Sequence, residues 1–162
     1  MKPMKLIDEE KIRKDNRRFL KHFPRIEDNS TLVILKGHLL IEELLNELIE
    51  RRLDRPEELR DVDLTFNQRL FMAKALYSMA TKGEWFWEAI KKLNNLRNQL
   101  AHHLEPKGFH DKLEDFLKYV EIKRDIMPEE FYKKESRLYI AIFSIHFRLS
   151  FLLSQKPLLG GQ

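Results

Sequence analysis

Apolar and polar residues alternate along this chain with the spacing of amphipathic helices. The strongest pattern covers residues 30–53, where apolar side chains recur every three or four positions and leave only a narrow polar stripe. A helix that is apolar over so much of its surface normally lies at the centre of a domain. We therefore expect a central helix here, with a buried surface made by Leu32, Leu35, Leu39, Ile41, Leu44, Leu45, Leu48 and Ile49.

Prolines that stop helices and polar residues that cap them divide the rest of the chain into further helices. Pro24 follows the first helix, Pro106 follows the fourth, and Pro128 begins the sixth. Thr65 and Thr81 each stand three residues before a Gln or a Glu, which is the spacing of a capping box. The predicted helices cover residues 8–22, 30–53, 66–80, 82–103, 108–124 and 128–155.

These helices are predicted to form one all-α domain over residues 1–162. The length is that of a single domain, and the chain contains no internal repeat, low-complexity tract or long linker. Because the predicted connections are short, neighbouring helices should pack antiparallel as a single bundle of about six helices. We expect an N-terminal helix in residues 1–25, a core bundle in residues 30–155 and a loose tail in residues 156–162.

Composition agrees with a helical, soluble protein. The chain is 43% hydrophobic and 35% charged, with only 5 glycines, which favours helices over sheets. It has no cysteine, which excludes disulfides, thiolate chemistry and cysteine-based metal centres. The first ten residues lack the apolar stretch of a signal peptide, and the longest apolar region, residues 138–153, is shorter than the ~20 residues of a membrane span. We expect a cytoplasmic protein that does not associate with membranes.

The charge distribution leaves two interpretations open. The net charge of +4 is compatible with binding a polyanion. Residues 11–21 are basic, whereas residues 42–63 are rich in carboxylates. These segments are either two solvated helix faces, or the first is a basic wall along an RNA path. A similar choice applies to Phe143, Phe147 and Phe151, which recur every four residues and belong either to the core or to a dimer face.

Polar side chains suited to ligand binding gather near the end of the fourth predicted helix. Residues 93–104 contain neither Glu nor Lys, although surface helices favour both, and they contain Asn, which is a poor helix former. A local cost in helix stability indicates that these polar groups have a role. They are Asn94, Asn95, Arg97, Asn98, His102 and His103.

Helical spacing distributes these side chains over different faces. Asn95, Asn98 and His102 lie on one line at i, i+3 and i+7, whereas Arg97 lies on another face. His103 continues the apolar line of the helix and is expected to be partly buried. We therefore expect His102, rather than His103, to be the functional histidine, with Asn94 and Asn95 as possible supporting residues.

An arginine and a histidine can together cleave RNA without a metal ion or a cofactor. Histidine titrates near neutrality and can take the proton of a ribose 2′-hydroxyl, so that the alkoxide attacks the adjacent phosphate. The permanent charge of arginine stabilises the charge that develops there. At about 100° per residue, Arg97 and His102 differ by roughly 140° around a straight helix. Either the helix loosens before Pro106, or two copies of the chain face each other.

The segment Arg97-Asn98-x-x-x-His102 resembles the Arg-x4–6-His signature of the HEPN superfamily. The resemblance implies a homodimeric, metal-independent endoribonuclease that acts on RNA, often as a toxin or a phage-defence effector. It implies that Arg97 binds phosphate, that Asn98 supports it and that His102 transfers the proton; His103 also fits the allowed spacing. A regulatory protein or antitoxin is a possible partner, but Leu104 replaces the tyrosine found in some toxin subgroups, which argues against a nucleotidyltransferase antitoxin.

The order of elements over residues 30–105 is also similar to the mannitol operon repressor group, a relative of the same superfamily. That similarity implies a non-catalytic regulator or scaffold that acts through protein contacts. In the enzyme, Arg97 and His102 should be accessible and face a basic, symmetric cleft. In the scaffold, they should be buried and hydrogen-bonded within one chain.

Other candidate sites have weaker support. His102 and His103 diverge on the helix and lack a third metal ligand, so no metal site is expected. His22, His38 and His146 are expected to be partly buried, satisfied side chains. Of Trp85 and Trp87, which do not share a face, one should be core and the other partly exposed. A DNA-binding repressor would need a recognition helix in a helix-turn-helix, which the pattern does not show.

Overall fold

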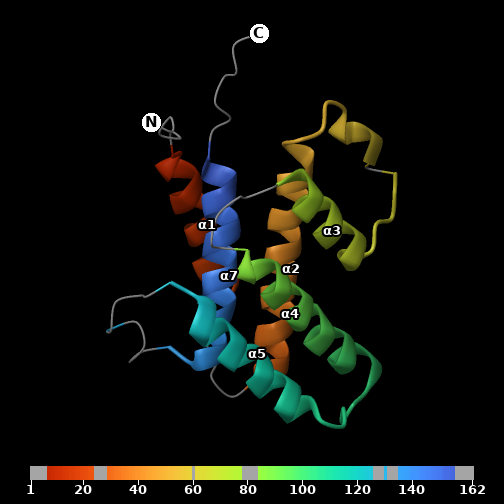
Figure 1. The fold of residues 1–162 in the computed structure, drawn as a ribbon, viewed down its shortest axis with the longest axis vertical. Coiled ribbons are helices and arrows are strands. Elements are labelled where there is room, and N and C mark those ends of the chain that lie inside the picture. Colours follow the sequence, from red (N-terminus) through yellow and green to blue (C-terminus); the bar gives the residue numbers. More distant parts are fainter. Residues whose placement is uncertain are drawn as a thin grey trace.

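The computed structural model places an all-helical chain in one bundle (Figure 1), as the sequence predicts. It describes residues 7–23, 29–59, 61–77, 84–125, 130 and 135–155. The predicted tail, residues 156–162, lies outside them. The described helices are α1 (Glu9–His22), α2 (Ser30–Glu50), α3 (Phe66–Leu76), α4 (Trp85–His102), α5 (Phe109–Lys123) and α7 (Arg137–Ser154), with a 3-10 helix at Pro56–Leu59.

Helix α2 lies at the centre of the bundle, as its apolar pattern predicts. In Figure 1 it stands between α7 on one side and α3 and α4 on the other, and it contacts all three. Ile41, Leu45 and Leu48 are fully buried. The predicted surface is less buried near the start of α2, where Leu32 and Leu35 are half-buried and Leu39 is 55% exposed.

Helices α1 and α7 form a second layer beside α2. Helix α1 runs antiparallel to α7, since Asp8 bonds to the backbone of Ser154 while Phe19 packs on Tyr139. Helices α2 and α7 instead run in the same direction, since Gly37 contacts Ile142 while Arg51 reaches the carbonyl of Leu153. The consecutive helices α2 and α3 also run in the same direction, since Arg69 binds Asn46 while Tyr77 lies beneath Arg52. The prediction that neighbouring helices pack antiparallel is therefore wrong for this pair, because the connection between them, residues 51–65, is long.

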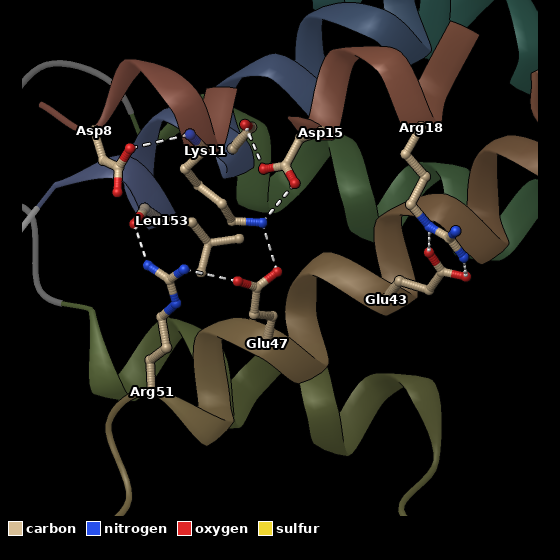
Figure 2. Close-up of polar contacts among 9 residues, drawn as sticks. Asp8, Lys11, Asp15, Arg18, Glu43, Glu47, Arg51 and Leu153 are labelled. Carbon is tan, nitrogen blue, oxygen red and sulfur yellow. Dashed lines mark hydrogen bonds and ion pairs between the residues drawn. The ribbon is translucent and has the colours of Figure 1, made fainter. Parts of the chain in front are cut away.

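A polar layer joins α1, α2 and α7 (Figure 2). The buried carboxylate of Asp15 accepts hydrogen bonds from Ser150 Oγ, at 2.6 Å, and from the Lys11 ammonium, which also contacts Glu47 at 2.7 Å. Because each buried charge has a partner, the layer avoids the desolvation cost of an isolated ion. Further along the same helices, Arg18 binds Glu43 through two nitrogens.

These contacts bear on the basic segment of α1. Arg13 and Arg17 pair with Glu9 and Glu10 of the same helix, and Lys11 and Arg18 pair with carboxylates of α2. Four of the six basic side chains of residues 11–21 are thus paired, whereas Lys14 and Lys21 form no ion pair with the described residues. This arrangement favours a solvated helix face over a basic wall along an RNA path.

The prediction of one continuous last helix over residues 128–155 is wrong. Glu130 is helical, but Glu135 and Ser136 are not, and α7 begins at Arg137. Ser136 has an extended backbone and its side chain accepts a hydrogen bond from the backbone N–H of Tyr139, which makes it an N-cap. Pro128, the predicted first residue, lies outside the described residues.

The predicted bounds of α3 and α4 also shift. The capping box of Thr65 and Gln68 is present and begins α3, as predicted, but α3 ends at Leu76. Thr81 lies outside the described residues, and Glu84 occupies the N-cap of α4 without a side-chain bond. At the start of α4, Trp87 is buried and Trp85 is partly exposed, as expected.

Helix α7 is long and apolar enough, by length and composition, to cross a membrane. In the fold, however, 72% of its 18 residues are buried against other helices. Phe143, Phe147 and Phe151 are half-buried, and Phe143 meets the Phe19 ring edge-on at 5.2 Å. Helix α7 is thus a core helix, consistent with a soluble protein.

Candidate functional site

An open pocket of about 340 Å³ lies between α2, α3 and α4. Helix α2 contributes side chains that point away from the α7 side, the segment before α3 forms one wall, and α4 forms the other. Most of the lining residues are polar or charged, which distinguishes the pocket from the apolar core. They are His38, Glu42, Asp63, Leu64, Thr65, Phe66, Asn67, Arg69, Asn94, Arg97 and Asn98.

A chain of hydrogen bonds at the pocket joins the three helices. His38 Nε2 lies 3.0 Å from Asn94 Oδ1, and Asn94 Nδ2 donates to Asn67 Oδ1 at 3.1 Å. Since an amide oxygen only accepts, His38 is the donor in the first contact. Both His38 and Asn94 are buried, and the Phe66 ring stacks on His38 at a centroid distance of 4.0 Å.

Burial sets the protonation state of His38. Loss of solvent lowers the pKa of the imidazole below its ordinary value, and the nearby charge of Arg97 acts in the same direction. The hydrogen bond with Asn94 and the charge of Glu42 oppose this shift. His38 is therefore a neutral imidazole at physiological pH, with its proton on Nε2 facing Asn94.

Arg97 is half-buried at the pocket and keeps its positive charge uncompensated. Its Nη1 donates to Asn98 Oδ1 at 3.2 Å, and it forms no ion pair with any carboxylate of the described residues. Arg69, which lines the same pocket, binds Asn46 Oδ1 at 2.8 Å and pairs with Glu42 at 3.4 Å. Of these two arginines, only Arg97 therefore has an uncompensated charge that could bind an anionic ligand.

The structure places the predicted site residues in two groups. Asn94, Arg97 and Asn98 line the pocket together. His102 is exposed at the last turn of α4 and does not line it, and Asn95 is exposed on another side of the helix. Helix α4 is α-helical through His102, so it does not loosen between Arg97 and His102, and their angular separation is retained within one chain.

His103 was predicted to continue the buried line of α4, and this is wrong. Helix α4 ends at His102, and His103 has an extended backbone, with φ of -138° and ψ of 132°. This change of direction leaves the His103 side chain exposed. Both histidines are therefore accessible, and burial does not distinguish them.

Sequence reasoning missed the contribution of Asn67 and Arg69 to this pocket, and assigned no role to His38. His38 is buried and satisfied, as expected, but it is satisfied by Asn94 of the candidate site. The sequence offered two hints: a histidine within the strongly apolar residues 30–53, and the Asn-rich residues 94–98. The expectation fails for the other two histidines, since His22 is exposed and the buried His146 has no partner at Nδ1 among the described residues.

The pocket gives no indication of a metal centre. Within the described ranges, no group of three His, Asp or Glu side chains is placed to hold a metal ion. The chain matches no family model, no curated protein and no solved structure. The resemblance to the HEPN superfamily therefore depends on the Arg97–His102 segment and on the order of elements over residues 30–105, and no family membership is assigned.

Proposed function

We propose that this protein is a cytoplasmic, homodimeric, metal-independent endoribonuclease. The observation that carries the proposal is the uncompensated charge of Arg97 at a polar pocket, with an accessible His102 at the end of the same helix. Arginine binds phosphate and stabilises the charge that develops on it, and histidine transfers protons near neutral pH. Both residues belong to the segment that resembles the HEPN signature.

In the proposed reaction, His102 takes the proton of a ribose 2′-hydroxyl. The 2′-oxygen forms a bond to the adjacent phosphorus, and the bond from phosphorus to the 5′-oxygen breaks as that oxygen takes up a proton from water. Arg97 stabilises the extra negative charge on the phosphate oxygens during this step. The products are a 2′,3′-cyclic phosphate and a 5′-hydroxyl, and DNA is not a substrate because it lacks the 2′-hydroxyl.

The proposal requires two copies of the chain. Since α4 stays helical through His102, Arg97 and His102 of one copy point in directions that differ by roughly 140°. A two-fold axis near the end of α4 would bring Arg97 of one copy opposite His102 of the other. Asn98 then holds Arg97 through its Oδ1 contact.

The test is cleavage of a mixed RNA pool in excess EDTA by the natural protein and by Arg97→Ala, His102→Ala and His103→Ala. We expect the first two substitutions to lower the rate by about a hundredfold or more, since each removes a group acting in the transition state. His103→Ala tests the other histidine that fits the signature spacing, since His103 is also exposed. If His102 is the functional histidine, His103→Ala should keep most of the activity, whereas a loss in His103→Ala alone would assign the role to His103. Cleavage that survives Arg97→Ala, or that needs a metal ion, would contradict the proposal.

A non-catalytic regulator or scaffold is the second candidate. It is favoured by the His38–Asn94–Asn67 chain, in which two buried side chains are satisfied within one copy, as in a structural network. In this case the protein would act by binding another protein, such as an antitoxin or a regulatory partner. A folded natural protein that cleaves no RNA, alongside unchanged secondary structure in all three variants, would favour this candidate.

A further inference from the structure

The direction of the hydrogen bonds decides what the pocket offers to a ligand. A guanidinium group only donates, so the contact between Arg97 and Asn98 uses the amide oxygen of Asn98. The Asn98 Nδ2 group therefore keeps its hydrogens, and it has no acceptor among the described residues. The N–H groups of Arg97 that do not donate to Asn98 also have no acceptor among the described residues.

Hydrogen bonds also set the orientation of the Asn67 amide, on the α3 side of the pocket. His38 donates to the oxygen of Asn94, which turns Asn94 Nδ2 toward Asn67, and Asn67 accepts through its oxygen. The Asn67 Nδ2 group is left without an acceptor among the described residues. Asn67 itself is exposed, so that group is accessible.

Two carboxylates also line the pocket. The Glu42 carboxylate is paired with Arg69 at 3.4 Å, whereas Asp63, in the segment before α3, is exposed and forms no ion pair with the described residues. Asn67, Arg97 and Asn98 present N–H donors to the pocket, and Arg97 adds a full positive charge. Donors around a positive charge complement a group that has only acceptors and a negative charge, which describes a phosphate diester.

We propose that Asn67 of α3 joins Arg97 and Asn98 of α4 in binding a backbone phosphate of an RNA strand. This inference rests on the proposed function in taking the phosphate to belong to RNA. His38 and Asn94 act as positioning residues, because they hold the amide of Asn67 with its donor outward. The pocket volume of about 340 Å³ is within the range of small-ligand sites and leaves room for a nucleotide around the phosphate.

The test uses Asn67→Asp, which replaces the side-chain NH2 group by an oxygen of similar size. The aspartate keeps an oxygen for Asn94 Nδ2 but replaces the outward amide by a negatively charged acceptor. The control is Ala75→Asp, which adds the same charge at an exposed position of α3 outside the pocket. The probe is a fluorescein-labelled, 2′-O-methylated RNA strand, which cannot be cleaved, and the readout is its anisotropy at low salt.

We expect Asn67→Asp to weaken binding of this strand by about tenfold or more, as the loss of a hydrogen bond to a charged group predicts. Ala75→Asp should stay within about twofold of the natural protein, and Asn67→Ala should weaken binding with no added charge. Equal affinities for Asn67→Asp and Ala75→Asp would overturn the inference, as would no binding by the natural protein. Binding that depends on Asn67, in a natural protein that cleaves no ordinary RNA, would remove the proposed nuclease and leave the phosphate site standing.

Discussion

At the scale of single residues, His146 shows how burial determines protonation. Its imidazole is 2% exposed, lies 4.7 Å from the Phe19 ring, and has no partner at Nδ1 among the described residues. Burial first, and then the positive charge of Lys11, lowers the pKa of His146 to about 3, while Glu43 opposes the shift. The folded protein therefore holds this histidine neutral well into the acid range.

This histidine should make the fold sensitive to acid. Below about pH 6.5 the unfolded chain takes up a proton that the folded chain refuses, so stability is lost as pH falls toward 3, by about 1.4 kcal/mol per pH unit. His146→Phe removes the titrating group and keeps an aromatic ring beside Phe19. Urea denaturation at pH 7 and pH 5 should show a larger loss of stability in the natural protein than in the variant. Equal losses would mean that other groups control the acid response.

The sequence predicts those residues of the candidate site that lie close together on one helix. The composition of residues 93–104 identifies Arg97 and Asn98, and both line the pocket. The partners of Asn94 were not predictable, because His38 and Asn67 are separated from it by 56 and 27 positions along the chain. Helical spacing within α4 contains no information about which side chains of other helices face it.

At the scale of elements, the crossing of α2 and α7 depends on one glycine. A Cβ atom on Gly37 would lie 2.7 Å from Ile142 Cγ2 and 3.1 Å from Phe23 Cε2. Such distances are too short for carbon contacts, so the absence of a side chain lets the two helices approach closely. The sequence pattern alone did not predict this role, since a glycine within a helix indicates only a lower helix propensity.

Two physical effects predict opposite signs for the change in the free energy of unfolding that Gly37→Ala causes. Helix propensity alone would stabilise the protein by about 1 kcal/mol. The overlap with the fully buried Ile142 should outweigh it and destabilise the protein by about 1–3 kcal/mol. The free energy of unfolding from urea titration gives the sign directly, and Lys36→Ala, at the exposed neighbouring position, is the control. A more stable Gly37→Ala protein would show that the crossing relaxes without cost.

The start of a helix could be predicted from the sequence where a capping box marks it. Thr65 with Gln68 begins α3 as predicted. The last helix was predicted as continuous because Ser136 was not recognised as a capping residue within the apolar pattern. In the structure, the Ser136 side chain caps α7 and its extended backbone interrupts the helix. Arg137 then binds Glu121 and Glu114 of α5, and these ion pairs fix the start of α7 against that helix.

At the scale of the whole molecule, the sequence predicts an all-α bundle with α2 at its centre, and this is confirmed. The parallel courses of α2 with α7 and of α2 with α3 could not be predicted, because only short connections force two helices to run antiparallel. The connection between α2 and α3, residues 51–65, is long, and α2 and α7 are not consecutive. Whether two copies associate is a prediction of the proposed function, which requires Arg97 and His102 to come from different chains.

Mixing two inactive variants tests that requirement. If each site combines Arg97 of one copy with His102 of the other, a dimer of Arg97→Ala and His102→Ala chains contains one complete site. After subunit exchange in an equal mixture, we expect roughly a quarter of the natural RNA cleavage to return, since half of the dimers are mixed and each has one complete site of two. The rate is measured in excess EDTA, before and after exchange. A mixture as inactive as its components would show that both residues act from one chain.

The position of α7 in the sequence has a consequence for the synthesis of the protein. Helices α1 and α2 leave the ribosome before α7, yet both pack against it. Until α7 has left the exit tunnel, the face of Phe19 that packs on Tyr139 and Phe143 in the finished fold remains in contact with solvent. The core is therefore incomplete until α7 has been made, and cellular chaperones have the whole of that interval in which to bind the chain.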